Sequence, residues 1–313
     1  MPYLLGVDVG SGSAWTAICR RAPEPAGWGP AEAVATDAPP AVPGLFRRCG
    51  DDVPVYYDDL FITPQALVVE QARKAADTVW ERQGEGPERI AVACPTAWGP
   101  GRLGPLRAAF NDAGMSNVVL ITRAQAVVER LHATGRPVPP GRPLLVCRIG
   151  RASTEITFAV PYEPGRLEVL GVAETCELGG DDVAAGARDA TAALLDLIRR
   201  TARDCGAALG ELAAVLPAGG GAARPAVFEA LAGAIAAPVI RDDDPWHTVA
   251  RGAALSLRPP VQSSRMLPEP VAEVLVKPTE LLPVTGTRLR LPEPGEMPAR
   301  PPLTVAAPEI GRK

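Results

Sequence analysis

The chain has 313 residues, of which 47% are hydrophobic, and carries a formal net charge of −4 with a sequence pI of about 5.4. This length predicts a sizeable core divided between two lobes or domains. The acidic balance excludes a global basic field that would attract nucleic acid or an anionic membrane. No apolar run has the length of a membrane span, and the first residues lack the basic and apolar segments of a secretion signal.

Apolar patterns predict an α/β fold whose order of elements occurs twice along the chain. In the first half we expect strands at residues 3–9, 15–19, 31–36, 89–94 and 117–122, and helices at 64–82, 103–111 and 124–133. In the second half we expect strands at 144–149, 154–160, 167–173 and 214–218, and helices at 180–205, 224–235 and 247–255. Each half therefore has the order hairpin, helix, strand, helix, which indicates a duplication.

Proline- and glycine-rich segments separate these elements. Residues 22–30 and 37–50 are expected to be connections, and 135–143 a linker between the halves. We therefore expect a first lobe at residues 1–138, a second lobe at 139–257, and a proline-rich, largely extended tail at 258–313.

The N-terminal residues 6–14 place glycines and serines between two predicted strands. Gly10 and Gly12 allow a sharp turn, so that backbone N–H groups near Ser11 and Ser13 face one phosphate. Asp8, near the end of the first strand, would face the same point and hold a metal ion through water. A plain β-hairpin can carry the same glycines, so both interpretations stay open.

Two more glycine motifs follow in the second half. Gly219, Gly220 and Gly221 precede a helix and would let a flat purine lie close to the backbone. The same glycines can instead serve only as strand–helix turns, and for Gly179 and Gly180 we favour that structural role.

Short motifs at residues 6–13, 90–122, 178–182, 218–221 and 244–254 resemble, in this order, the nucleotide-binding domain of the DnaK-type heat shock protein 70 family. They resemble the actin and sugar-kinase superfamily more distantly. The resemblance implies a two-lobed actin-like ATPase fold with duplicated ribonuclease-H-like lobes, and ATP or ADP in the cleft. It also implies nucleotide contacts from Asp8, Gly10, Ser11, Gly12, Ser13, Arg148, Gly150, Arg151, Gly219, Gly220 and Gly221.

The chain departs from this family where the family carries acidic groups. The resemblance places Arg148 at a carboxylate of the second phosphate loop and Arg123 at a catalytic glutamate, so that Asp8 is the one retained acid. Arg151 and Ala152 replace glycines of the same loop. Because phosphoryl transfer depends on positioned charge and metal, and one such contact is worth roughly 10²–10³ in rate, we expect inefficient hydrolysis and no magnesium site.

Two interpretations of Arg148 and Arg151 remain open. Their guanidinium groups can hold a phosphate or another anion without a metal. Alternatively, Arg148 pairs with Asp8 across the cleft and locks the lobes together. We favour the ion pair, because an unpaired buried carboxylate is costly.

The cysteines, an acidic run and three tryptophans are expected to have structural roles rather than functional ones. Six scattered cysteines without CxxC spacing predict a reduced, cytoplasmic protein without a structural metal. The acidic run 242–244 is expected to be a solvated loop and helix cap. Trp80, Trp98 and Trp246 are expected to pack in the core or between the lobes rather than to stack on a ligand.

Together these observations predict a degenerate relative of the heat-shock-70 chaperones. We expect a non-hydrolysing or weakly nucleotide-binding scaffold or regulatory module, with a protein partner that contacts the proline-rich tail and with no nucleic-acid partner. No residue is assigned a catalytic role. The alternative is a slow ATPase of the chaperone family, and residues 93–100 also look like actinobacterial chaperone-like proteins associated with specialised secretion.

Overall fold

The computed structural model describes residues 1–10, 13–23, 27–36, 44–136, 138–139, 141–163, 165–184 and 188–259. Contacts divide the chain into one unit at Met1–Val261 and a second at Gln262–Lys313. All described residues belong to the first unit. The predicted tail from residue 260 onward lies outside the described residues, as do Ser11 and Gly12.

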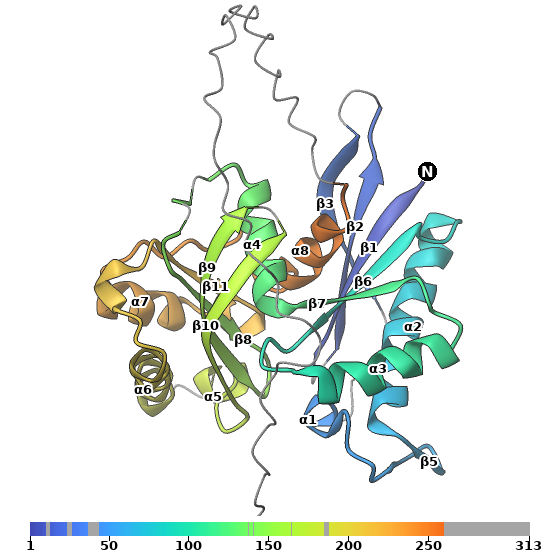
Figure 1. Ribbon diagram of the computed structural model, residues 1–313, viewed down its shortest axis with the longest axis horizontal. Helices are drawn as coiled ribbons and strands as arrows, with labels where there is room; N and C mark the ends of the chain where they lie inside the picture. The colour runs from blue at the N-terminus through green and yellow to red at the C-terminus, as the bar shows by residue number, and fades with distance from the viewer. Residues whose placement is uncertain are drawn as a thin grey trace, which may run out of the picture. The chain divides into compact units, whose positions relative to one another are not determined.

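The first sheet has five strands in the order β3-β2-β1-β6-β7 (Figure 1). β1, β2 and β3 are antiparallel, whereas β1, β6 and β7 are parallel. The strands are β1 (Tyr3–Val9), β2 (Ala14–Arg21), β3 (Trp28–Val34), β6 (Arg89–Cys94) and β7 (Val118–Thr122).

The second sheet repeats this order with β10-β9-β8-β11. Its first three strands are antiparallel and β11 runs parallel to β8. A parallel bridge from Val215 to Val239 continues the sheet beyond β11, where β7 stands in the first sheet. The strands are β8 (Leu144–Ile149), β9 (Thr154–Glu163), β10 (Arg166–Thr175) and β11 (Ala214–Ala218).

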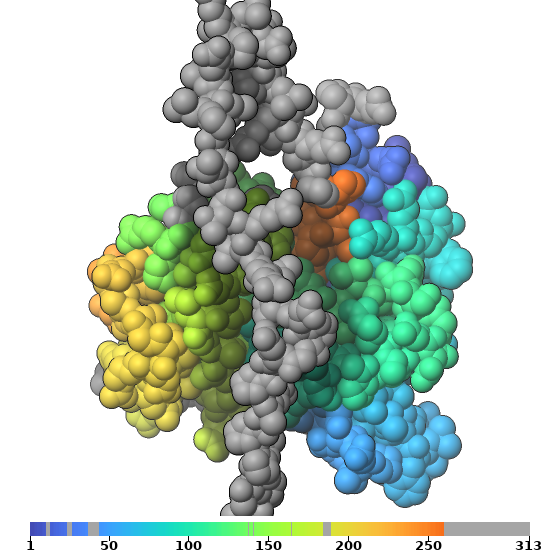
Figure 2. Space-filling model, in the orientation of Figure 1, coloured from blue at the N-terminus to red at the C-terminus, as the bar shows by residue number. Residues whose placement is uncertain are grey.

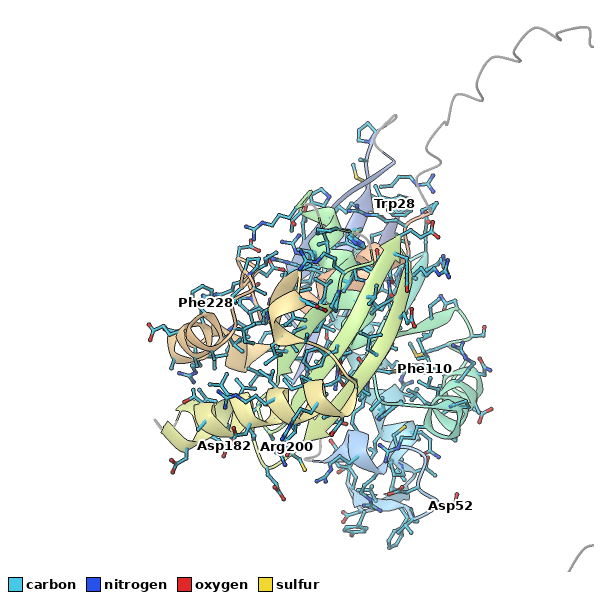
Figure 3. The ribbon with its side chains drawn as sticks, turned by 60° about the vertical axis from the view of Figure 1, so that its left-hand side comes forward. Trp28, Asp52, Phe110, Asp182, Arg200 and Phe228 are labelled. Atoms are coloured by element: carbon cyan, nitrogen blue, oxygen red, sulfur yellow. The ribbon has the colours of Figure 1, made fainter. Side chains whose placement is uncertain are left out.

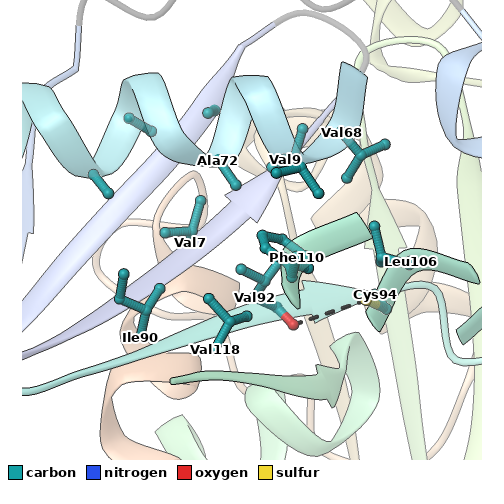
Figure 4. Packing of buried hydrophobic residues seen from close by; sticks show 14 of the residues in the cluster. Val7, Val9, Val68, Ala72, Ile90, Val92, Cys94, Leu106, Phe110 and Val118 are labelled. Carbon is teal, nitrogen blue, oxygen red and sulfur yellow. Dashed lines mark hydrogen bonds between the residues drawn. The ribbon is translucent and has the colours of Figure 1, made fainter. Parts of the chain in front are cut away.

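Helices α2 (Pro64–Gln83) and α3 (Pro100–Asp112) cover one face of the first sheet. Figure 4 shows this packing, in which Val7 and Val9 of β1 lie among side chains of both helices and of β6. The apolar face of α2 is buried, and it consists of Leu67, Val68, Ala72, Ala75, Ala76 and Val79. Thr63 caps the helix by accepting a hydrogen bond from the Ala66 amide, so local sequence and tertiary packing agree on where it begins.

Helices α4 (Arg123–Ala133) and α8 (Thr248–Ser256) lie between the two sheets (Figure 1). Their close approach depends on glycine. A Cβ at Gly6 would lie 2.1 Å from the Ala250 carbonyl oxygen, and one at Gly252 would lie 1.7 Å from that of Ala126. Because these clashes involve backbone atoms, side chains at either position would push α8 away from β1 and α4.

Further helices cover the outer face of the second sheet. They are α5 (Gly180–Ala184), α6 (Arg188–Asp204) and α7 (Pro225–Ala234), with the 3₁₀ turns η1 (Leu209–Glu211) and η2 (Gly220–Ala223). The single helix expected at residues 180–205 is assigned as α5 and α6, and residues 185–187 between them lie outside the described residues.

The predicted α/β class is confirmed, with differences at short elements. β3 begins at Trp28, inside a predicted connection, because it pairs with the well-formed β2. The segment 37–50 was expected to be a connection, yet helix α1 (Leu45–Arg48) lies there and buries Leu45 and Phe46. The hairpin β4 (Val55–Tyr57) and β5 (Leu60–Ile62) was not predicted. Elements of three or four residues carry too little periodicity to be recognised.

No helix in the described part of the chain is long and apolar enough to cross a membrane. The six cysteines are free thiols, as their spacing predicts.

Candidate ligand cleft

A cavity of about 350 Å³ lies between the two sheets, at the ends of β1, β8 and β11. This volume falls near the lower limit of roughly 300–1,000 Å³ for small-molecule sites. It is lined by Asp8, Gly10, Ser13, Trp15, Arg148, Gly150, Arg151, Gly180, Asp181, Gly219, Gly220, Gly221, Arg224 and Trp246. The structure thus brings together every predicted site residue except Ser11 and Gly12, which lie outside the described residues.

Two equivalent turns build the floor of this cavity. Each follows the first strand of its sheet and leads into the antiparallel second strand. The Gly10 amide donates to the Ser13 carbonyl at 2.9 Å, and the Gly150 amide donates to the Ser153 carbonyl at 2.8 Å. Strand alternation then turns the residue two before each glycine, Asp8 or Arg148, toward the layer between the sheets.

Asp8 and Arg148 meet across that layer. Arg148 Nη2 lies 3.3 Å from Asp8 Oδ2, and both side chains are almost fully buried. The ion pair favoured from the sequence is therefore confirmed. The sequence did not predict that Arg123, the first residue of α4, would hold the other oxygen: its Nε lies 3.3 Å from Asp8 Oδ1. Arg123 also donates to the Val9 carbonyl at 3.2 Å.

Glu155 on β9 completes a buried set of two acids and two bases. It lies opposite Arg148 in the strand register and 4.0 Å from Arg123 Nη1. It also accepts hydrogen bonds from the Thr96 amide at 3.0 Å and the Thr96 hydroxyl at 2.6 Å. We call Asp8, Arg123, Arg148 and Glu155 the charge tetrad. The sequence feature that could have revealed Glu155 is its position as an acid within the otherwise apolar predicted strand 154–160.

The tetrad determines the charge of Asp8. Burial by itself would raise the pKa of this carboxyl group, but the charges and hydrogen bonds of Arg148 and Arg123 outweigh it and hold the pKa below its ordinary value. For Glu155 burial prevails and raises the pKa. Asp8 is consequently ionised at neutral pH, and both of its oxygens face guanidinium groups.

The second acid that lines the cavity is also paired. Arg151 Nε lies 2.9 Å from Asp181 Oδ2, with both side chains about two-thirds exposed. Arg224, on the rim, has no ion pair among the described residues. Within the described residues no group of three His, Cys, Asp or Glu side chains is arranged to hold a metal ion.

The glycines at residues 219–221 serve the packing of the chain itself. Gly219 has φ +86°, and a Cβ there would lie 2.5 Å from the Ile149 carbonyl oxygen. A Cβ at Gly221 would lie 2.2 Å from Ile149 Cγ2. These contacts press η2 against the end of β8, which supports the structural interpretation of the motif.

An indole covers the remaining glycine. A Cβ at Gly220 would lie 2.1 Å from the Trp246 ring, so the ring rests directly on the backbone where a purine was expected. Trp246 also contacts Trp15 of β2, with ring centroids 5.1 Å apart, and Trp15 meets His247 edge-on at 4.9 Å. Trp246 is 43% exposed. Trp246 therefore lies outside the core and forms a wall of the cavity, but its contacts with Trp15 of the first half and Gly220 of the second agree with the alternative expectation of packing between the two halves.

Nor does the acidic run 242–244 behave as a purely solvated loop. The Asp242 side chain is only 6% exposed and accepts from Arg130 Nε at 2.7 Å and Nη2 at 2.9 Å, while Arg251 lies 3.6 Å away. Burial opposes ionisation, yet hydrogen bonds from Arg130 lower the pKa of Asp242. These bonds fasten the segment before α8 to α4. Asp243, in contrast, is exposed as expected.

The chain matches no protein-family model, and no curated protein matches it. The likeness to heat-shock-70 proteins therefore rests on the motifs alone and stays a prediction.

Proposed function

We propose that the chain is a two-lobed, actin-like module of the heat-shock-70 type that works by binding rather than by hydrolysing nucleotide. The repeated strand order supports this architecture, because both sheets place an antiparallel hairpin beside parallel strands. So does the position of the cavity, which is bounded by the equivalent turns of the two sheets.

One observation carries the proposal: Asp8 is held between Arg123 and Arg148. A magnesium ion needs carboxylate or phosphate oxygens free to enter its octahedral shell. Both Asp8 oxygens already accept from arginine, and two buried cations nearby would repel the metal. The residues present do not fit magnesium, so no hydrolytic step is derived through it.

The alternative, a slow ATPase, needs another acid directed at the cavity. Glu155 is the nearest buried acid, but Thr96 and Arg123 take its oxygens. Asp181 lies at the exposed rim and pairs with Arg151. Neither acid is free to position water or metal, and we favour the binding module.

A phosphate-release assay on the full chain tests this proposal. We expect release from ATP that is no faster with magnesium than with EDTA, and equal in the wild type and in Asp8→Asn. Magnesium-dependent release that Asp8→Asn abolishes would overturn it. Because that variant is destabilised, the comparison of magnesium with EDTA on the wild type stands as an independent measurement. Calorimetric titration of ATP and ADP under both conditions then reports whether either nucleotide binds.

The protein partner stays a proposal as well. Its expected contact region at residues 258–313 falls almost wholly outside the described residues.

A further inference from the structure

The β4–β5 hairpin presents an aromatic face that no other described residue covers. The register pairs Tyr56 with Phe61, which places both on the same face of this two-stranded sheet. Tyr56 is 63% exposed and Phe61 is 77% exposed, the larger of these being unusual for phenylalanine. Figure 3 shows this region projecting from the first unit near the labelled Asp52, and Figure 2 shows it as a light-blue protrusion.

The opposite face of the hairpin is anchored. Val55 is buried in the core of the first half, and Tyr57 and Ile62 pack against the same cluster. Arg48 Nη2 donates to the carbonyls of Val53 at 2.8 Å and Pro54 at 3.3 Å. A two-stranded ribbon is marginal by itself; these contacts hold it in place.

The exposed rings are also held in one arrangement. Their centroids lie 5.4 Å apart at an interplanar angle of 56°. The Tyr56 hydroxyl donates to Asp59 Oδ1 at 2.7 Å. Asp58 and Asp59 form the turn with φ +51° and +61°, the left-handed geometry of a tight hairpin turn. An ordered aromatic surface loses little conformational entropy when a partner binds.

All charged side chains within the hairpin segment itself are acidic. Asp51, Asp52, Asp58 and Asp59 lie in residues 51–63, a segment that contains no lysine, arginine or histidine. None of the four carboxylates forms an ion pair with a described residue. The patch therefore combines exposed aromatic rings with carboxylates that are free of ion pairs to described residues.

We propose that this aromatic-acidic hairpin docks a segment of a partner protein in which arginine or lysine alternates with apolar side chains. Guanidinium and ammonium groups are attracted both to the faces of aromatic rings and to the neighbouring carboxylates. A second copy of the same hairpin is disfavoured, because it would bring eight carboxylates together.

Fluorescence anisotropy with the full chain tests the docking surface. The probes are two labelled ten-residue peptides, one of alternating leucine and arginine and one of alternating leucine and glutamate. We expect the arginine peptide to bind at least about tenfold more tightly and its affinity to fall as salt is added. We expect Phe61→Ala, and separately Asp58→Asn with Asp59→Asn, to weaken it by about tenfold.

Trp80→Ala is the matched control, since Trp80 is 55% exposed on α2, outside the hairpin. It should bind the arginine peptide like the wild type. Asparagine keeps the left-handed turn at residues 58 and 59, and circular dichroism checks that each variant is folded. The proposal fails if neither peptide binds, if the hairpin variants bind like the wild type, or if Trp80→Ala loses affinity equally. It also fails if the chain alone forms dimers that Phe61→Ala dissociates.

Discussion

The turns after β1 and β8 are each closed by a hydrogen bond from a glycine amide to a serine carbonyl, but the residues before them carry opposite charge. Asp8 stands two residues before Gly10, and Arg148 stands two residues before Gly150. Their partners across the hairpins differ too: Asp8 lies opposite Trp15, whereas Arg148 lies opposite Glu155. In each half the same backbone hydrogen bond closes the turn, and the acid of the first half pairs with the base of the second.

This difference shows how a cleft can keep its shape while its chemistry is satisfied internally. Two carboxylates at these positions would repel each other unless a cation were bound between them. Opposite charges need no bound ion, and Arg123 with Glu155 completes a set of two acids and two bases.

The largest loss of unfolding free energy should come from removing the Asp8 carboxylate. Asp8→Ala leaves two buried arginines with one acid, and loss of one partner from a buried ion pair costs about 3–5 kcal/mol. Urea denaturation measures the change in unfolding free energy. Asp181→Ala is the matched control at the same cavity, because its pair with Arg151 is exposed and such pairs contribute about 0–1 kcal/mol. Equal effects of the two substitutions would contradict a buried tetrad.

Exchanging the two charges tests whether the positions are equivalent. Arg148→Asp and Asp8→Arg should each destabilise the fold, since each places like charges together. The double variant restores an ion pair of reversed direction and should be more stable than the sum of the single effects by about 0.5–3 kcal/mol. Thermal and urea unfolding of all four proteins gives this coupling energy. Simple additivity would mean that Asp8 and Arg148 do not interact.

Much of this arrangement was predictable because the strands that carry it are continuous apolar runs. β1 and β8 have the predicted bounds. The pair of Asp8 with Arg148 was predicted from the family resemblance, which placed both residues at one cleft, together with the cost of burying an unpaired carboxylate. Arg123 was recognised as a departure from the family, but its contact with Asp8 depends on how α4 crosses between the sheets. That crossing is set by long-range packing, including the contact of Gly252 with α4, which no local pattern reveals.

What the sequence left open or missed has a similar physical origin. For Trp246 the sequence left open whether the ring packs in the core or between the lobes. Its position on Gly220 depends on the path of residues 241–247, which is fixed by Arg130 and Asp242 from distant parts of the sequence. The β4–β5 hairpin was missed because its turn carries Asp58 and Asp59 in place of the glycine that marks most tight hairpin turns.

The pH dependence of stability separates Asp8 from the rest of the tetrad. Because the folded-state pKa of Asp8 is lowered, its stabilisation is present above the unfolded pKa and is lost as the pH falls through the folded value. Because burial raises the folded-state pKa of Glu155, its contribution to stability has the opposite pH dependence: it is present below the unfolded pKa and is lost as the pH rises through the folded value. The difference in unfolding free energy between the wild type and Asp8→Asn should thus be full at pH 7 and shrink below about pH 4. A difference in unfolding free energy that grows as the pH falls would contradict the lowered pKa of Asp8.

The smallest change in stability is expected at the indoles of Trp15 and Trp246, which lie where the first sheet meets the segment before α8. Trp246→Ala removes the ring from Gly220 and its contact with Trp15, and such aromatic pairs contribute about 0.5–1.5 kcal/mol beyond their buried area. If the indole stands where a purine would lie, its removal should raise the affinity for ADP by roughly the two- to tenfold that this energy represents. Calorimetric titration of ADP into the variant, the wild type and Trp80→Ala measures it. A loss of affinity in Trp246→Ala alone would mean instead that the ring stacks on the ligand. The indole would then form part of the ligand-binding surface beside residues 219–221, rather than block it.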